Sequence, residues 1–401
     1  MRRWFPFVLF AITLLSFSDI ARAQITCPPA AGIPPAVVNC GSPKFRSCSI
    51  DVGGTPRHFC AHRPAGPLPP GGTPVIVGLH GGGGMASRTV NWFDHGVDDR
   101  AILIAPSAMP SADDPVGGCS RRWRSLGGSI ATWADFAAPD ANGCGPAAVD
   151  NGHDLQFIEQ LLDEIEAVEE VSAFYVFGFS NGAGMVLQLF ITEPLASRFA
   201  GYGVVGNGIN VAKIEQQAVG GSYLGFSENQ NTRRPMMMII GTDEKPYLAY
   251  DRMIDAVVAL NAAGACPSVA TPQEVIGCFA RNPSAPGMAK NTLLTRRSET
   301  RDWLVAFNNA VPRAIESLYP DLGHGFAAPR QHDTTLVTRQ HYPPIPNADS
   351  QPVTLLTVVD GKHNMPGADG NHAPCNGNCD IVGYDEIRQF WRAYADLQDW
   401  P

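Results

Sequence analysis

Six short apolar runs, each followed by glycine, proline or a polar turn, constrain the fold more than any other feature of the sequence. The runs are four to seven residues long and lie at 74–79, 101–105, 174–177, 202–205, 236–240 and 353–359. Continuous apolar runs of this length are typical of strands that are covered on both faces, as in parallel sheets. Residues 154–168, between two of these runs, carry apolar side chains at helical spacing. Strands that alternate with helices predict an α/β fold with a mostly parallel sheet flanked by helices.

The strand pattern is not divided by a low-complexity linker or an internal repeat, so we expect one domain over residues 24–401. Residues 27–60 are rich in Pro, Gly and Cys and are expected to wrap the core, followed by an early edge strand at 57–61. Residues 251–348 interrupt the pattern before the last strand. We expect them to form an insertion or a lid, with a helix near 310–317.

The amino-terminal residues indicate export. A basic start, Met1 to Arg3, precedes an apolar run at 4–17, and the small-x-small pattern Ala21-Arg22-Ala23 follows. The run is shorter than the roughly 20 apolar residues that a membrane-spanning helix needs. We therefore expect a signal peptide over residues 1–23 and a secreted protein, either extracellular or periplasmic.

The charge of the chain excludes two classes of partner. The whole sequence holds 29 Lys and Arg against 38 Asp and Glu, and the expected signal peptide removes three Arg and one Asp. The mature part then has 26 basic and 37 acidic residues, a formal net charge of −11. This acidity argues against nucleic acid and anionic membrane as partners. We expect a monomer that acts on a small or polymeric substrate.

All ten cysteines lie after the expected signal peptide. They occur as near neighbours along the chain: Cys27, Cys40, Cys48 and Cys60; Cys119 and Cys144; Cys266 and Cys278; Cys375 and Cys379. An even number in an exported protein predicts disulfides, here between local partners, although the sequence does not fix the connectivity. A zinc site made by His372, Cys375 and Cys379 is the alternative. The oxidising compartment favours disulfides, so we expect no metal and no cofactor.

Gly178-Phe179-Ser180-Asn181-Gly182 matches the pattern G-x-S-x-G. The pattern alone is weak because glycine and serine are common. Here it lies between an apolar run at 174–177 and an apolar helical segment at 183–191, which is the context that a nucleophile elbow requires. In such a turn the two glycines let strand and helix approach closely, and the serine hydroxyl is exposed above the sheet. We therefore predict that Ser180 is a nucleophile.

A serine nucleophile needs a base and an acid that orients the base. In the nucleophile-elbow fold the chain order is Ser, then Asp or Glu, then His. Asp243 follows the apolar run at 236–240 by one short turn, which predicts the acid. Two histidines compete for the base: His363 follows the last apolar run, whereas His324 lies in the expected insertion. Because a base needs a rigid support, we predict that His363 is the base.

Backbone N–H groups are expected to stabilise the oxyanion of the tetrahedral intermediate. One would come from Asn181, which directly follows the nucleophile. The other would come from the glycine-rich loop after the run at 74–79, which reads His80-Gly-Gly-Gly-Gly. Glycines let the backbone approach a substrate without side-chain clash. We select Gly82 for this role, with Gly83 as the next choice.

Four stretches of the chain resemble the secreted polyhydroxybutyrate depolymerase and feruloyl esterase family of α/β-hydrolases. They are Val75–Gly81, Val176–Gly182, Ile240–Asp243 and Asp360–Gly367, and together the resemblance extends over roughly residues 58–260 and 354–394. The last stretch resembles the family's Gly-rich turn, catalytic His and Pro-Gly, with Met365 where the family commonly has Trp. The resemblance implies an α/β-hydrolase fold and Ser180, Asp243 and His363 as a catalytic triad.

The resulting hypothesis is hydrolysis of a carboxylic ester through an acyl-enzyme. The substrate would be a hydroxyalkanoate polyester or oligomer, or an aromatic ester of feruloyl type, as the resemblance implies. A serine peptidase on the same triad is an alternative. Another is a non-catalytic binding protein that keeps the fold, although such proteins typically lack a triad member and none is missing here.

Overall fold

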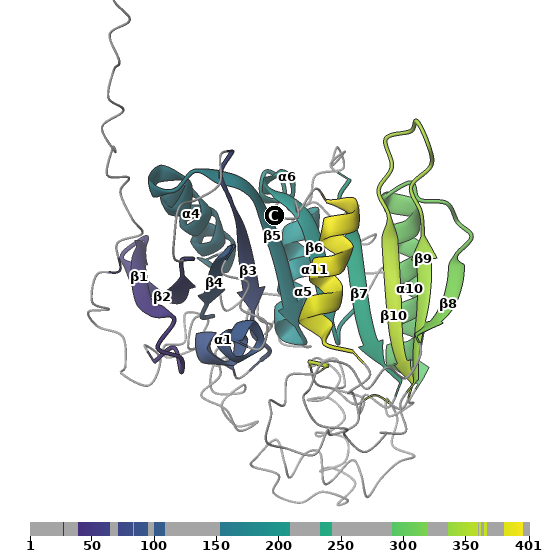
Figure 1. The fold of residues 1–401 in the computed structure, drawn as a ribbon, viewed down its shortest axis with the longest axis horizontal. Coiled ribbons are helices and arrows are strands. Elements are labelled where there is room, and N and C mark those ends of the chain that lie inside the picture. The colour runs from purple at the N-terminus through teal and green to yellow at the C-terminus, as the bar shows by residue number, and fades with distance from the viewer. Residues whose placement is uncertain are drawn as a thin grey trace, which may run out of the picture.

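The computed structural model describes residue 27 and the ranges 39–64, 71–82, 84–94, 100–108, 153–208, 233–242, 291–319, 336–359, 361, 365–366 and 381–395. Its described strands form one ten-stranded sheet with the order β1-β2-β4-β3-β5-β6-β7-β10-β9-β8 (Figure 1). Their bounds are β1 Arg46–Val52, β2 Thr55–His62, β3 Thr73–Leu79, β4 Ile102–Pro106, β5 Val171–Phe179, β6 Phe199–Val205, β7 Met236–Gly241, β8 Ile315–Tyr319, β9 Leu336–Tyr342 and β10 Val353–Val359.

The six apolar runs of the sequence are the six central strands. β4, β3, β5, β6, β7 and β10 lie side by side and all run parallel. The prediction of a mostly parallel sheet is correct only for this centre, because antiparallel pairings of β1, β2 and β4 at one side and of β8, β9 and β10 at the other make the described sheet mixed. β2 contains the expected strand at 57–61, but it is not an edge strand because β1 pairs outside it.

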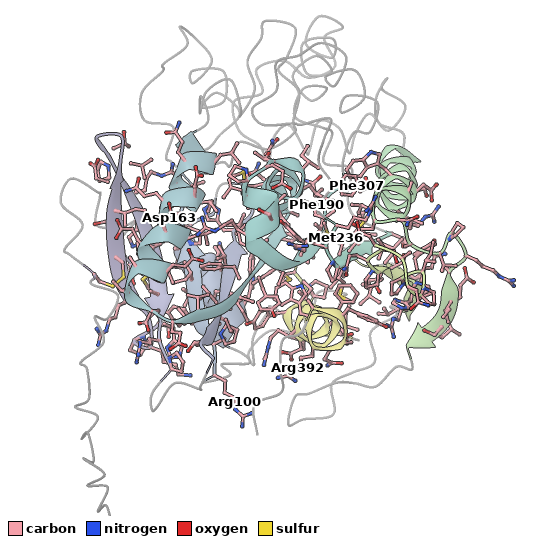
Figure 2. The ribbon with its side chains drawn as sticks, turned by 90° about the horizontal axis from the view of Figure 1, so that it is seen from above. Arg100, Asp163, Phe190, Met236, Phe307 and Arg392 are labelled. Atoms are coloured by element: carbon pink, nitrogen blue, oxygen red, sulfur yellow. A yellow bond between two sulfur atoms is a disulfide. The ribbon has the colours of Figure 1, made fainter. Side chains whose placement is uncertain are left out.

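Helices cover both faces of the sheet, as expected for an α/β fold. α4 (His153–Val168), α5 (Asn181–Ile191) and α10 (Asn291–Phe307) lie on one face, and α11 (Gly383–Tyr394) lies on the other (Figures 1 and 2). α1 (Ala86–Asp94) packs with α11 in one apolar cluster, whereas α4, α5 and Leu304 of α10 belong to the other. Short α6 (Leu195–Arg198) precedes β6. Two buried layers therefore hold the central strands rigidly between helices.

The described part of the expected insertion joins the sheet. α10, β8 and β9 come from it, and β9 pairs with β10 along its whole length. The helix expected near 310–317 is wrong, since β8 begins at Ile315 and pairs with β9. The rest of the insertion, including its segment 251–290, lies outside the described residues.

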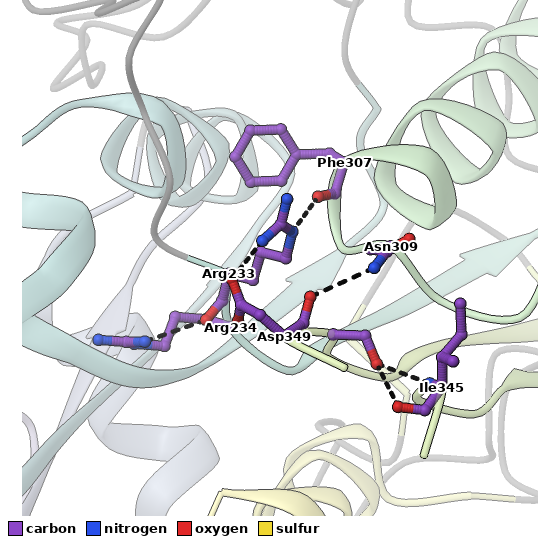
Figure 3. A network of polar contacts seen from close by, with 7 residues as sticks. Arg233, Arg234, Phe307, Asn309, Ile345 and Asp349 are labelled. Carbon is purple, nitrogen blue, oxygen red and sulfur yellow. Dashed lines mark hydrogen bonds and ion pairs between the residues drawn. The ribbon is translucent and has the colours of Figure 1, made fainter. Parts of the chain in front are cut away.

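A polar network fixes the end of α10 beside the start of β7 (Figure 3). The Arg233 guanidinium donates to the carbonyl oxygen of Phe307 at 3.0 Å and pairs with the Asp349 carboxylate. Nδ2 of Asn308 donates to the carbonyl oxygen of Arg234 at 2.8 Å. These bonds lie at the amino end of β7, which is the end of the parallel strands opposite to Ser180.

Two disulfides tie the amino-terminal segment. Cys27 pairs with Cys48, and Cys40 pairs with Cys60. Disulfides form in oxidising compartments, so both bridges agree with the expected export and confirm local pairing for this group. The other six cysteines lie outside the described residues. Within the described part of the chain, no helix is long and apolar enough to cross a membrane.

Candidate active site

Ser180 lies in a sharp turn between β5 and α5, at the carboxyl end of a central strand. Its backbone has φ 53° and ψ −118°, a combination that non-glycine residues rarely adopt. Its N–H donates to the carbonyl oxygen of Val205 at the end of β6, at 2.8 Å. A strained serine between a central strand and a buried helix is the geometry of a nucleophile elbow. Together with the central parallel strands and the helices on both faces, this turn fits an α/β-hydrolase fold.

The glycines on each side of the elbow are required by close backbone approach. A Cβ atom on Gly178 would lie 2.4 Å from the backbone of Gly182, and one on Gly182 would lie 2.4 Å from the carbonyl oxygens of Leu79 and His80. Both separations are far below van der Waals contact. Small residues are therefore required at both positions, as expected from the sequence, because the backbone brings the start of α5 against the end of β3.

Replacing Gly182 by alanine is expected to lower kcat/KM for ester hydrolysis by about 10²-fold or more. The added methyl would push the loop after β3 away from the elbow, and a shift of about 1 Å in a reacting group is enough for this loss. Gly54→Ala in the β1–β2 turn is the control, because it strains a backbone with φ +86° in open space. Equal losses of activity per folded molecule in both variants would contradict the close approach.

The loop after β3 lies beside the elbow, and His80 fixes its start. Leu79 pairs with Gly178 in the parallel ladder of β3 and β5. The N–H of Ala108 donates to Nε2 of His80 at 3.0 Å, so Nε2 is unprotonated. Nδ1 then carries the proton and donates to the carbonyl oxygen of Gly81 at 2.8 Å. The predicted oxyanion donor Gly82 follows directly and is exposed, while Asn181, the other predicted donor, begins α5 and is buried.

Burial lowers the pKa of His80 to about 4, and the positive charge of Arg57 acts in the same direction, while the bond to Gly81 opposes it. A folded-state pKa below the unfolded value of 6.5 means that the unfolded chain binds the proton more tightly. Stability from neutral His80 is therefore complete above pH 6.5 and is lost as the pH falls toward 4. We expect this loss to be about 3 kcal/mol in the free energy of unfolding.

Urea unfolding of wild type and His80→Gln at pH 7.5 and pH 4.5 measures this contribution. The variant lacks the titrating ring, so the stability difference between the two proteins should narrow at the lower pH. A difference that is the same at both pH values would show that His80 is not held neutral in the folded state.

Asp243 and His363 themselves lie outside the described residues, but the strands before them are described. β7 ends at Gly241 and β10 ends at Val359, and the two are parallel neighbours two and three strands away from β5. The N–H of Thr242 donates to the carbonyl oxygen of Val358 at 2.9 Å. Both chain segments thus leave the sheet at the same edge as Ser180, which is the premise of their predicted roles as acid and base.

Met365 and Pro366, which follow His363 in the chain, are anchored to the core. Met365 is 3 % exposed, and the N–H of Gly383 donates to the carbonyl oxygen of Pro366 at 3.0 Å. Met365 and Pro366 therefore pack at the start of α11 and fix the chain two residues beyond His363. This gives a physical role to Met365, which stands where the resembled family commonly has Trp.

Several other sequence candidates also lie outside the described residues: Gly83, His324, His372, Cys375 and Cys379. The choice of His363 over His324 therefore stays a prediction. So does the choice of disulfides over a zinc site. In the described part of the chain, the possible ligand atoms of Cys40, His58 and Cys60 lie within 4.8 Å of one another, but the two cysteines are joined in a disulfide. That group provides no thiolates for a metal.

Asn207, two residues after the end of β6, is a residue near the nucleophile that the sequence patterns did not indicate. Its Nδ2 donates to the carbonyl oxygen of Ser180 at 2.8 Å. The only signal in the sequence is its position in Gly206-Asn207-Gly208, directly after the apolar run at 202–205.

Comparisons with known proteins give distant structural likeness alone. No protein-family model and no curated protein matches the chain. The siderophore hydrolase EstB from Aspergillus nidulans is 15% identical over 92% of this chain and 100% of its own, with a TM-score of 0.42. Poly(aspartic acid) hydrolase-1 from Sphingomonas sp. KT-1 is 15% identical over 60% of this chain and 98% of its own, with a TM-score of 0.35. At these TM-scores, neither fold nor function is transferred from these proteins.

Proposed function

We propose that this protein is a secreted serine hydrolase of carboxylic esters that acts through an acyl-enzyme. The observation that carries the proposal is the strained backbone of Ser180 in the turn between β5 and α5, beside the glycine-rich loop after β3. Strain of this kind persists only where the surrounding structure holds it, and such residues cluster at active sites. A strand-turn-helix serine next to a glycine loop is suited to acyl transfer.

The proposed reaction has two halves. Oγ of Ser180 attacks the ester carbonyl carbon while His363 takes its proton, and the N–H groups of Gly82 and Asn181 stabilise the oxyanion. The intermediate collapses, the bond to the alcohol breaks, and His363 returns the proton to the departing alkoxide. Water then attacks the acyl carbonyl carbon while His363 takes one of its protons. The bond between the acyl carbon and Oγ of Ser180 breaks, His363 returns the proton to Oγ, and the acid is released. Asp243 orients the imidazole throughout.

The substrate class follows from the family that the motifs resemble. We propose a hydroxyalkanoate polyester or oligomer, or an aromatic ester of feruloyl type. A purified mature protein should be assayed with short p-nitrophenyl esters, methyl ferulate, hydroxybutyrate oligomers and an aromatic polyester. Turnover of at least one ester class is the expected result. Cleavage of peptides without cleavage of esters would favour the peptidase alternative, and no turnover of any substrate would favour the binding-protein alternative.

A further inference from the structure

The side-chain amide of Asn207 is held at both of its polar atoms. Nδ2 donates to the carbonyl oxygen of Ser180 at 2.8 Å, and Oδ1 accepts from the N–H of Gly208 at 2.7 Å. A carbonyl oxygen can only accept and a backbone N–H can only donate, so these partners fix which end of the amide faces the elbow. Asn207 is half-buried, which limits competition from water.

The backbone at the end of β6, directly before Asn207, is held in place by hydrogen bonds to β7 and to Ser180. Gly206 has φ +67°, a conformation that residues with a Cβ rarely adopt, and its N–H donates to the carbonyl oxygen of Ile239 in β7 at 2.9 Å. The end of β6 is therefore anchored to β7 on one side. On the other side, Val205 accepts the N–H of Ser180 at 2.8 Å.

Both backbone polar atoms of Ser180 are thus bound to the exit of β6. The carbonyl oxygen also accepts the first helical bond of α5, from the N–H of Gly184 at 3.1 Å. That oxygen belongs to the same planar peptide unit as the N–H of Asn181, the proposed oxyanion donor. In a trans peptide the C=O and N–H vectors point in opposite directions and cannot rotate independently. Any group that fixes the oxygen of Ser180 therefore also fixes the direction of the Asn181 N–H.

We infer that Asn207 is a positioning residue, which aims the Asn181 N–H at the oxyanion by holding the Ser180–Asn181 peptide plane. The inference rests on the proposed function, because the Asn181 N–H that Asn207 would orient is an oxyanion donor only if the protein is an ester hydrolase. An oxyanion donor acts only if it is preorganised toward the position where charge develops. Without the amide of Asn207, the peptide plane keeps the helical bond to Gly184 but loses its lateral restraint.

Two variants test this role. Asn207→Ala removes the whole amide, whereas Asn207→Asp keeps the shape and the acceptor for Gly208 but removes the donor to Ser180. Both are expected to lower kcat/KM for p-nitrophenyl acetate by about 10- to 100-fold. The rate must be expressed per active site, counted from the p-nitrophenolate released when a p-nitrophenyl phosphonate reacts with Ser180. A residue needed only for folding would reduce the number of titrated sites and leave the rate per site unchanged.

Asn308→Ala is the matched control. Nδ2 of Asn308 also donates to a backbone carbonyl at 2.8 Å, that of Arg234, at the opposite end of the parallel strands. This variant loses the same kind of bond, and its rate per titrated site should stay within about twofold of wild type. Wild-type rates per titrated site in both Asn207 variants would overturn the positioning role while leaving the proposed function intact. If the wild type neither hydrolyses the ester nor reacts at Ser180, the proposed function fails and the role of Asn207 falls with it.

Discussion

Replacing Ser180 by alanine is expected to lower ester hydrolysis by about 10⁴- to 10⁶-fold while the protein stays folded. The substitution removes the nucleophile and so abolishes the acyl-enzyme route, whereas oxyanion donors and binding contacts remain. Initial rates with a p-nitrophenyl ester measure the effect. Circular dichroism and thermal unfolding of the same samples show whether the fold is kept.

Alanine at position 180 must still adopt the strained backbone, so its melting temperature need not equal that of wild type. Ser180→Cys serves as a second variant, because it keeps a polar side chain at the elbow. A Ser180→Ala protein that keeps wild-type turnover with an unchanged circular dichroism spectrum would contradict the assignment of the nucleophile.

Replacing His363 by alanine is expected to lower turnover by about 10³-fold or more, whereas His324→Ala should keep most of it. The expected difference comes from the chain segment that holds each histidine in place. His363 follows β10, which is buried between β7 and β9 and ends at the same edge of the sheet as β5. A base held by such a strand keeps the geometry that proton transfer needs, about 3 Å between partners.

The pH dependence of kcat/KM provides a second readout for the two histidines. Loss of the base should remove the acidic limb of the wild-type profile, and His324→Ala should leave that limb in place. If His324→Ala destroys turnover without unfolding and His363→Ala does not, the proposed triad is wrong. The chain segment around His324 would then belong to the catalytic centre.

The sequence was most informative where burial dictates composition. All six parallel strands could be predicted because both of their faces are covered, and such positions are filled mainly by apolar residues. β8 could not be recognised: it lies at the sheet edge with Ile315 61% and Leu318 67% exposed, and the residues around it suggested a helix. Its strand conformation comes from pairing with β9, a long-range contact that local propensity does not report.

The same distinction holds within the site. The elbow at Ser180 could be predicted because close backbone approach requires Gly178 and Gly182, which leaves a readable pattern. Asn207 could not, because a single polar residue in a glycine-rich turn has many ordinary explanations. Its bond to Ser180 depends on the parallel pairing of β5 with β6, in which Phe179 lies opposite Val205. Residues that act through a neighbouring strand become visible only when that pairing is known.

Covalent labelling of the intact protein tests the central claim most directly. The wild type should be incubated with a p-nitrophenyl alkylphosphonate, digested, and mapped by tandem mass spectrometry. The claim predicts one phosphonyl group per molecule, on Ser180, with loss of esterase activity in proportion to labelling, and no adduct in Ser180→Ala. An adduct on another serine whose formation tracks the loss of activity, with Ser180 unmodified, would contradict it.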